Sequence, residues 1–542
     1  MPIASRFSIA HRTFASAALS LVLGFAPRLA DARGVCPSGT CAGVGDYDVP
    51  ATAQVVTGRL VDYHPVATFE PKGILVQLRL SLGARVEGVE PFPIDRYGTR
   101  FDTGTAVSPV VRLGAIIDTR LVLKKVNIFA EYEHDLPTGT WTNSSFRDVD
   151  GMPNSNHITT QLRKAYARVS LGRYLHIGGG FMTNHWGMGL IANDGAHGWE
   201  PGSGQFVDPR GGNRVLRAYL ATGPLTRGNI QAAVAFDQVR GDDTLLTGRA
   251  DWHDDQAIQI IAELQAGYGR PSGGGFFFVH RRQKNAGDNT ELNVSVFDLA
   301  GRAEVSLCKH LKLKLEGEVA VISGSTTLGP TPEHPSHDVL QVGAGARANF
   351  DGGRLGMVWD FLFASGDKNY DDSRLNNFKV DSNYPMGILL FRYINAAQSA
   401  RTVVTASNPQ LVGYANQNLE RVPTRGGASN TIAFFPRLWM RPVHGLELYT
   451  GVLLAWSAVA NTDPFNTKLA GGTYRNALDG NPGSFYGAEF DLGIRYRMIF
   501  HGTMLMLGAE GGSLVPGSAF ATATGQNMAS VIGGRAMMEY RL

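Results

Sequence analysis

Apolar and polar residues alternate along most of the chain from residue 74 onward. In segment 74–82 every second side chain is apolar, and Gln77, Arg79 and Ser81 occupy positions between the apolar ones. Because successive side chains of a strand point to opposite faces, this alternation predicts a strand with one apolar and one polar face. Segment 311–322 continues the pattern over a length that suits a tilted membrane strand, which needs about nine to eleven residues.

Eighteen segments follow this pattern, and the connections between them are short and long in turn. The predicted strands are 74–82, 107–118, 121–134, 161–171, 174–183, 214–222, 229–238, 256–268, 275–284, 297–307, 311–322, 339–350, 355–365, 431–441, 446–457, 485–497, 503–512 and 528–542. Bacterial outer-membrane barrels have an even number of antiparallel strands, short periplasmic turns and long extracellular loops. The sequence therefore predicts an all-β fold: a single transmembrane, antiparallel, up-and-down β-barrel of about 18 strands over residues 74–542.

The N-terminus carries the pattern of a secretory signal peptide. Basic residues precede an apolar stretch at 14–26, and Ala30-Asp31-Ala32 matches a small-residue cleavage site. Residues 1–32 are thus predicted to be a signal peptide. No later run of eighteen apolar residues predicts a membrane-spanning helix. An exported chain that crosses a membrane with strands must do so as a closed barrel. We therefore expect the protein in the outer membrane of a Gram-negative bacterium.

Residues 33–73 do not alternate and are predicted to be an N-terminal periplasmic segment. They contain Cys36 and Cys41, which could form a small disulfide loop in an oxidising compartment or could remain separate thiols. Cys308 has no evident partner in the sequence.

Composition and motifs argue against several other classes of protein. Charged residues make up 18% of the chain, and the net charge of +3 gives no case for nucleic-acid binding. We find no nucleophile motif, phosphate-binding loop or zinc-ligand spacing, so we expect no enzyme activity, no metal site and no cofactor. The segment starting at Asp367 begins like a calcium loop but has Asp372 where such a loop needs Gly and Phe378 where it needs Glu, which leaves only loose calcium binding open.

The polar faces of the predicted strands carry many charged residues. A charged side chain facing lipid at the bilayer midplane costs about 2–4 kcal/mol, so these side chains are expected to face a wet lumen. Eighteen strands enclose an interior too wide to be filled by wall side chains alone. The candidate pore-lining residues are Arg302, Glu304, Lys312, Lys314, Glu316, Glu318, Arg347, Asp360, Arg437, Arg441, Glu489, Asp491, Arg495, Arg497, Arg535, Glu539 and Arg541. Cations slightly outnumber anions on the inward faces, which predicts a mild preference for anions.

Two long connections are candidates for narrowing this lumen. Residues 366–430 form the longest and contain an apolar piece at 388–391, so we expect this loop to fold inward or pack over the mouth. Residues 184–213, with Trp186 and Trp199, form a second candidate lid.

Three short motifs resemble the alginate-export family of outer-membrane channels. They are Leu171-Gly172-Arg173 followed by Asn184-His185-Trp186-Gly187-Met188-Gly189-Leu190, then Ala364-Ser365-Gly366-Asp367-Lys368-Asn369 followed by Phe378 and Tyr384-Pro385, and finally Tyr486-Gly487-Ala488-Glu489-Phe490-Asp491-Leu492. The resemblance implies a monomeric eighteen-stranded barrel that passes an anionic polysaccharide through an arginine-rich pore.

The functional prediction is a channel or porin that passes polar solutes or oligosaccharides, anionic ones among them, through a charged lumen. The alternatives are a plugged or non-conducting structural or adhesion barrel and, with less support, a barrel enzyme. Expected partners are outer-membrane lipid, a small polar solute or oligosaccharide, and the barrel-assembly machinery, for which Tyr540 in the last strand supplies an aromatic signal. No nucleic-acid partner is expected, and the sequence leaves the oligomeric state open.

Overall fold

The computed structural model divides the chain into two compact units, Met1–Tyr47 and Asp48–Leu542. It describes residues 67–69, 74–101, 105–119, 126–142, 157–195, 212–241, 256–284, 289–327, 334–369, 372–384, 386–399, 424, 426–500 and 503–541, all of them in the second unit. The predicted signal peptide and the cysteine pair Cys36 and Cys41 lie outside the described residues.

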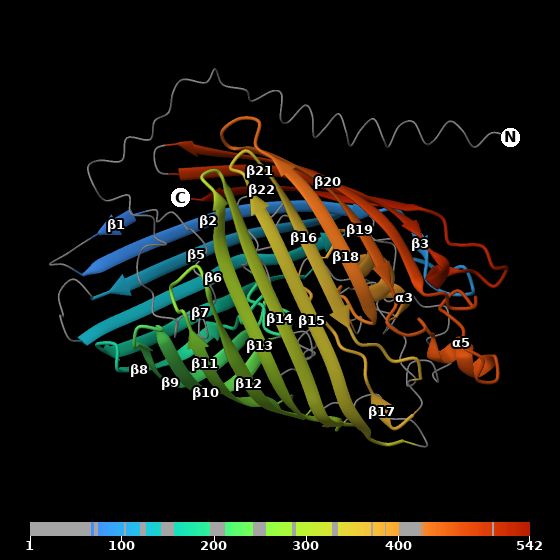
Figure 1. Ribbon diagram of the computed structural model, residues 1–542, viewed down its shortest axis with the longest axis horizontal. Helices are drawn as coiled ribbons and strands as arrows, with labels where there is room; N and C mark the ends of the chain where they lie inside the picture. Colours follow the sequence, from blue (N-terminus) through green and yellow to red (C-terminus); the bar gives the residue numbers. More distant parts are fainter. Residues whose placement is uncertain are drawn as a thin grey trace. The chain divides into compact units, whose positions relative to one another are not determined.

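The second unit is a closed antiparallel β-barrel (Figure 1). Its eighteen long strands are β2 (Leu75–Val89), β5 (Ala106–Asp118), β6 (Val126–Thr142), β7 (His157–Leu171), β8 (Leu175–Thr183), β9 (Arg214–Leu225), β10 (Ile230–Gly241), β11 (Gln256–Ala266), β12 (Gly273–Lys284), β13 (Glu291–Cys308), β14 (Leu311–Thr326), β15 (His337–Asp351), β16 (Leu355–Ala364), β18 (Thr431–Met440), β19 (Leu446–Trp456), β20 (Phe485–Phe500), β21 (Thr503–Pro516) and β22 (Val531–Arg541). Each pairs with its neighbours in the chain, and β22 pairs with β2 to close the barrel. The predicted fold class is confirmed, and every predicted strand overlaps one of these.

Short elements complete the described structure. They are β1 (Ala67–Phe69), β3 (Phe92–Pro93), β4 (Arg100–Phe101), β17 (Arg374–Leu375), a π-helix η3 (Leu390–Asn395), α3 (Ala396–Gln398), α5 (Pro464–Leu469) and a 3-10 turn η5 (Ser518–Phe520). β1 pairs with the start of β2, just beyond the last residue that β22 pairs there. Within the described ranges, no helix is both long and apolar enough to cross a membrane.

The outer surface of the barrel is apolar and the inner surface is polar. In β13, for example, Phe297 and Leu299 are exposed on the outside, whereas Asp298 between them is fully buried. A closed barrel pairs its backbone groups between strands, which is the condition for crossing a bilayer with strands. The chain is therefore a transmembrane β-barrel, and its even number of antiparallel strands matches the predicted place in a bacterial outer membrane.

Short and long connections lie at opposite ends of the barrel, as predicted. The short-turn end includes the connections 172–174, 226–229, 309–310 and 352–354. The long-loop end carries β3, α3 and α5, which gather on the right of Figure 1. The connection after β16 starts at this end.

One residue of a predicted outward face points inward instead. The alternation placed Tyr486 on the lipid face with Phe490, but the structure buries Tyr486 completely. A register shift opposite Ala455 and Trp456 marks a bulge in β20, and Gly487 within it has a φ of +136°. A bulge adds a residue to one strand and reverses the facing of the side chains beyond it. Periodicity alone cannot place such an insertion.

Candidate solute pathway

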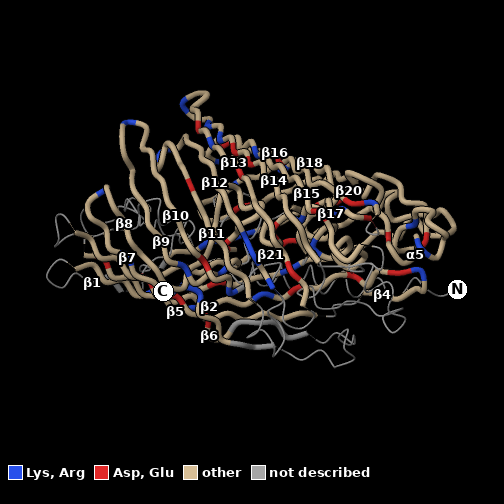
Figure 2. Tube along the Cα trace, turned by 90° about the horizontal axis from the view of Figure 1, so that it is seen from below, with Lys and Arg blue, Asp and Glu red and all other residues tan. Residues whose placement is uncertain are grey.

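The candidate pore-lining residues differ in their exposure to water. Arg302, Lys312 and Arg497 are exposed. The partly exposed residues are Glu304, Lys314, Glu316, Arg347, Arg441 and Arg535. The buried residues are Glu318, Asp360, Arg437, Glu489, Asp491, Arg495, Glu539 and Arg541. Figure 2 shows how basic and acidic positions recur along the strands.

A first cluster of opposite charges lies on β15, β16 and β18. Arg347 and Asp360 are direct partners in the register of β15 and β16, and the Arg347 Nε donates to the Asp360 Oδ1 at 2.5 Å. Arg437 on β18 donates to the other oxygen of the same carboxylate. One buried acid thus holds two guanidinium groups, and Glu316 on β14 is the direct partner of Arg347 in the register on its other side.

A second cluster joins β2, β21, β22 and the loop that follows β16. Arg535 forms an ion pair with Glu510 on the neighbouring strand. Glu87 accepts from Arg85 at 2.9 Å and lies 3.5 Å from Arg392, which belongs to η3. The ion pairs of this cluster join three cations and two acids.

A third cluster lies closer to the short-turn end. Glu447 on β19 pairs with Arg441 at 3.0 Å and with Arg495 on β20. The predicted charges on these late strands are therefore brought together in space, in groups of two or three.

In each of these clusters one cation meets water more than the acid beside it. The exposed fraction of the side chain is 20% for Arg347 against 0% for Asp360, 12% for Arg535 against 0% for Glu510, and 28% for Arg392 against 9% for Glu87. Arg441 is likewise 25% exposed and Glu447 9%. Arg437, Arg85 and Arg495 are buried with their acids. The exposed side of the three clusters is therefore mainly basic, although the chain is almost neutral.

The wall from β5 to β10 is built differently. Arg217 pairs with Asp237 at 2.6 Å, and Arg112 pairs with Asp135 at 2.6 Å, with all four side chains buried. Both partners of these ion pairs are closed to water, so their charges balance within the wall. These buried ion pairs on this side of the barrel link neighbouring strands and have a structural role.

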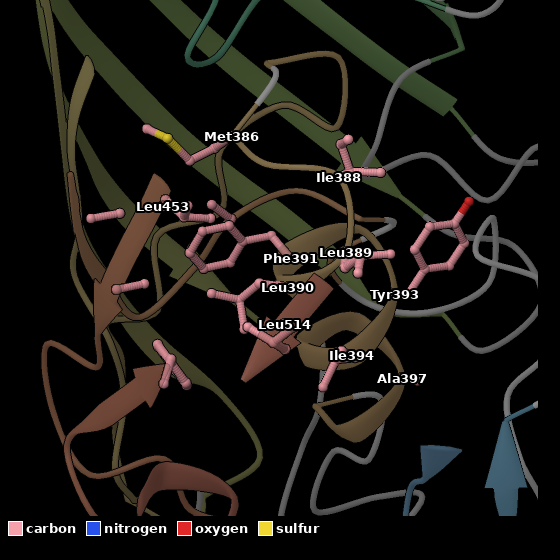
Figure 3. Close-up of a cluster of buried hydrophobic side chains, with 14 of the residues drawn as sticks. Met386, Ile388, Leu389, Leu390, Phe391, Tyr393, Ile394, Ala397, Leu453 and Leu514 are labelled. Atoms are coloured by element: carbon pink, nitrogen blue, oxygen red, sulfur yellow. The ribbon is translucent and has the colours of Figure 1, made fainter. Parts of the chain in front are cut away.

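The long loop after β16 folds into the lumen, as predicted. We call residues 376–384 and 386–399 the plug loop; its apolar side chains join a buried cluster with the wall and the other loops. In Figure 3, Leu390 and Phe391 lie near Leu453 of β19 and Leu514 of β21. Of the two expected arrangements, folding inward or packing over the mouth, the described residues of this loop show the inward one.

Four charged residues of the second cluster escaped the sequence prediction. The strand containing Arg85 and Glu87 was predicted to end at residue 82, because Gly83 and Ala84 interrupt the alternation. Glu510 lies within a predicted strand, and its alternation with Leu507 and Ala509 was signal enough to find it. Arg392 could not be placed without knowing how the loop folds.

The other candidates for chemistry show no assembled site. Cys308 is a free, exposed thiol at the end of β13. Among the residues that the structure describes, no group of three His, Cys, Asp or Glu is placed to hold a metal ion. Asp367 uses its carboxylate to accept from the backbone N–H groups of Asn369 and Asn376, which shapes the loop locally.

Comparison with known proteins finds similarity only among solved structures. No family model and no curated protein sequence matches the chain. Similar structures include three from Pseudomonas aeruginosa. OpdQ has 10% identity and a TM-score of 0.49, with 86% of this chain and 98% of that chain covered. OccK2 (OpdF) has 10% identity and a TM-score of 0.48, with 88% and 99% covered. OprD has 10% identity and a TM-score of 0.45, with 89% and 98% covered.

The resemblance to the alginate-export family is wrong. No family model supports it, and the similar structures are porins of the OprD/Occ group. Residues of the motifs that suggested this resemblance have local structural roles in the barrel. Trp186 stacks on Phe277 with ring centroids 5.0 Å apart, and Gly487 occupies a bulge.

Proposed function

We propose that this protein is an outer-membrane channel that passes small polar solutes and prefers anions. The observation that carries the proposal is the placement of charge on the wall from β15 to β22 and β2. There Arg347, Arg392, Arg441 and Arg535 meet water, and the acids that balance them lie behind. A lumen lined by one sign of charge raises the local concentration of the opposite ion.

The chemistry of these groups favours solutes with a carboxylate or phosphate. A guanidinium group presents parallel N–H donors that match the two oxygens of such anions. It also keeps its charge at any physiological pH. Each of these cations is already paired with an acid of the wall. A passing anion therefore competes with that acid for the guanidinium group and is not trapped.

The rest of the proposal concerns the export of the protein and its insertion into the outer membrane. Residues 1–32 direct export, residues 33–73 remain on the periplasmic side, and the assembly machinery inserts the barrel into outer-membrane lipid. No step of the proposal requires an enzyme activity.

A plugged structural barrel is the second candidate, and one observation favours it. The plug loop fills part of the lumen with buried apolar side chains. This candidate predicts an inserted barrel that carries no current, whereas the channel predicts steps of current.

The test is the reversal potential of single channels in a planar bilayer under a KCl gradient. Wild-type protein is expected to give an anion-selective potential, and Arg347→Gln combined with Arg535→Gln is expected to move it toward the cation side. Lys284→Gln is the matched control, because Lys284 is an exposed cation on the outer face of β12 that pairs with Glu291. A wild-type potential of cation sign would contradict the proposal.

A further inference from the structure

Two acidic residues of the wall accept hydrogen bonds from the backbone N–H groups of inward loops. We infer that Glu489 and Glu318 are positioning residues that hold the plug loop and a second inward loop together as one constriction, which sets the size of solute that passes. We call residues 184–195, between β8 and the next described segment, the lid loop. The inference rests on the proposed channel function.

Glu489 on β20 fixes the start of the helical turn in the plug loop. Its Oε1 accepts from the backbone N–H groups of Ile388 at 2.5 Å and Leu389 at 2.8 Å, and its Oε2 accepts from Leu390 at 2.8 Å. The first N–H groups of a helical segment have no partner within it, so a carboxylate placed there satisfies them. All four residues are buried, which makes these bonds strong and their loss costly.

Glu318 on β14 does the same for the lid loop. Its carboxylate accepts from the backbone N–H groups of Met188 and, at 3.2 Å, of Leu190. Trp186 of the same loop donates its indole N–H to Asp298 on β13 at 3.0 Å. Adjacent strands thus supply two acids to one loop.

The two loops are joined to each other as well as to the wall. The backbone N–H of Asp381 in the plug loop donates to the carbonyl oxygen of Leu190 in the lid loop at 2.8 Å. Asn213, at the far end of the connection that begins with the lid loop, donates its side-chain N–H to Asp381 at 3.1 Å. Release of either loop therefore removes a contact that holds the other.

Glycines on the inner wall leave room for the side chains of both loops. A Cβ at Gly343 would lie 2.2 Å from the Phe378 ring, and a Cβ at Gly533 would lie 2.7 Å from Leu389. At Gly275 it would lie 2.8 Å from Trp186 of the lid loop. The wall is shaped to fit these loops, so the constriction is a built part of the barrel.

The experiment compares step conductance and solute size limit for two kinds of variant. Glu489→Gln keeps the shape of the side chain but replaces one acceptor oxygen by an amide N–H₂ that opposes the N–H groups of the loop. Gly343→Ala leaves the charge unchanged and displaces Phe378, whose ring supplies the three atoms nearest to that Cβ. Both are expected to raise the step conductance at least twofold and to admit larger solutes than wild type.

The matched controls make the same two substitutions, Glu→Gln and Gly→Ala, at other positions of the barrel. Glu131→Gln changes a buried acid of β6 that contacts Lys164 and Tyr166 of the neighbouring strand. Gly301→Ala adds a methyl group where the nearest atom lies 3.9 Å away. Step conductance reports each inserted channel singly, so a variant that merely folds less well gives fewer steps of wild-type size.

The outcomes separate this inference from the proposed function. Larger steps in Glu489→Gln and Gly343→Ala, with both controls at the wild-type value, support the constriction. Anion-selective steps of the same size in all variants overturn the constriction and leave the channel standing. No steps in any inserted variant overturn both.

Discussion

Replacement of Asp360 by Asn removes the negative charge that pairs with both Arg347 and Arg437. The carboxylate is completely buried, Arg437 is almost completely buried, and Arg347 is 20% exposed. Removing one partner from a buried ion pair costs about 3–5 kcal/mol, because the other charge stays behind without compensation. The contribution of Arg347 is discounted for its contact with water. We therefore expect Asp360→Asn to lower the free energy of unfolding by about 3 kcal/mol.

The same change removes one negative charge and so makes the net charge of the lumen more positive by one. The preference for anions is therefore expected to rise. Urea unfolding of the barrel in lipid, followed by tryptophan fluorescence, gives the stability from the shift in midpoint at constant slope. The reversal potential in a KCl gradient gives the selectivity. Asp338→Asn is the control, since Asp338 is an exposed acid on the neighbouring strand β15 and its change is expected to cost less than about 0.5 kcal/mol. A loss below about 1 kcal/mol for Asp360→Asn, or a shift toward cations, would refute the account of this cluster.

Three further predictions concern other parts of the wall. Arg217→Ala leaves Asp237 buried without its cation, so stability is expected to fall by about 3–5 kcal/mol while the reversal potential of inserted channels is unchanged. Gly487→Ala forces a side chain into a φ of +136° with its Cβ 2.3 Å from the Val515 carbonyl oxygen, and the urea midpoint is expected to fall by at least the equivalent of about 2 kcal/mol. Cys308 is expected to react fully with a maleimide in the folded barrel, and Cys308→Ser to keep wild-type stability; protection of the thiol would contradict its exposed position.

The strands were predictable because their physical cause is local. Lipid on one side and water on the other impose a period of two on each strand, and segment 311–322 shows this in its residues alone. The prediction ended β2 at residue 82 because Gly83 and Ala84 carry too little side chain to reveal the alternation, although the strand continues to Val89. The facing of Tyr486 failed for a related reason, since a bulge inserts one residue without changing the composition.

The candidate site was predictable only as a set of inward-facing charges. Which side chain of an ion pair is exposed to water depends on which of the two covers the other, as Arg347 covers Asp360. This arrangement is set by contacts between strands, which the sequence alone does not give. The role of Glu489 depends on a loop a hundred residues earlier in the chain, where Ile388 to Leu390 meet its carboxylate. The length and apolar centre of that loop indicated that it folds inward, and nothing in them indicated its anchor.

The central claim is that the wet surface of the lumen is basic. The most direct measurement is the reversal potential of single wild-type channels, inserted into a planar bilayer with a tenfold KCl gradient. The account predicts discrete steps whose reversal potential has the sign of chloride permeation. A reversal potential with the sign of potassium permeation would contradict the account. So would the absence of current steps from both the wild type and Gly343→Ala when both proteins are shown to be inserted.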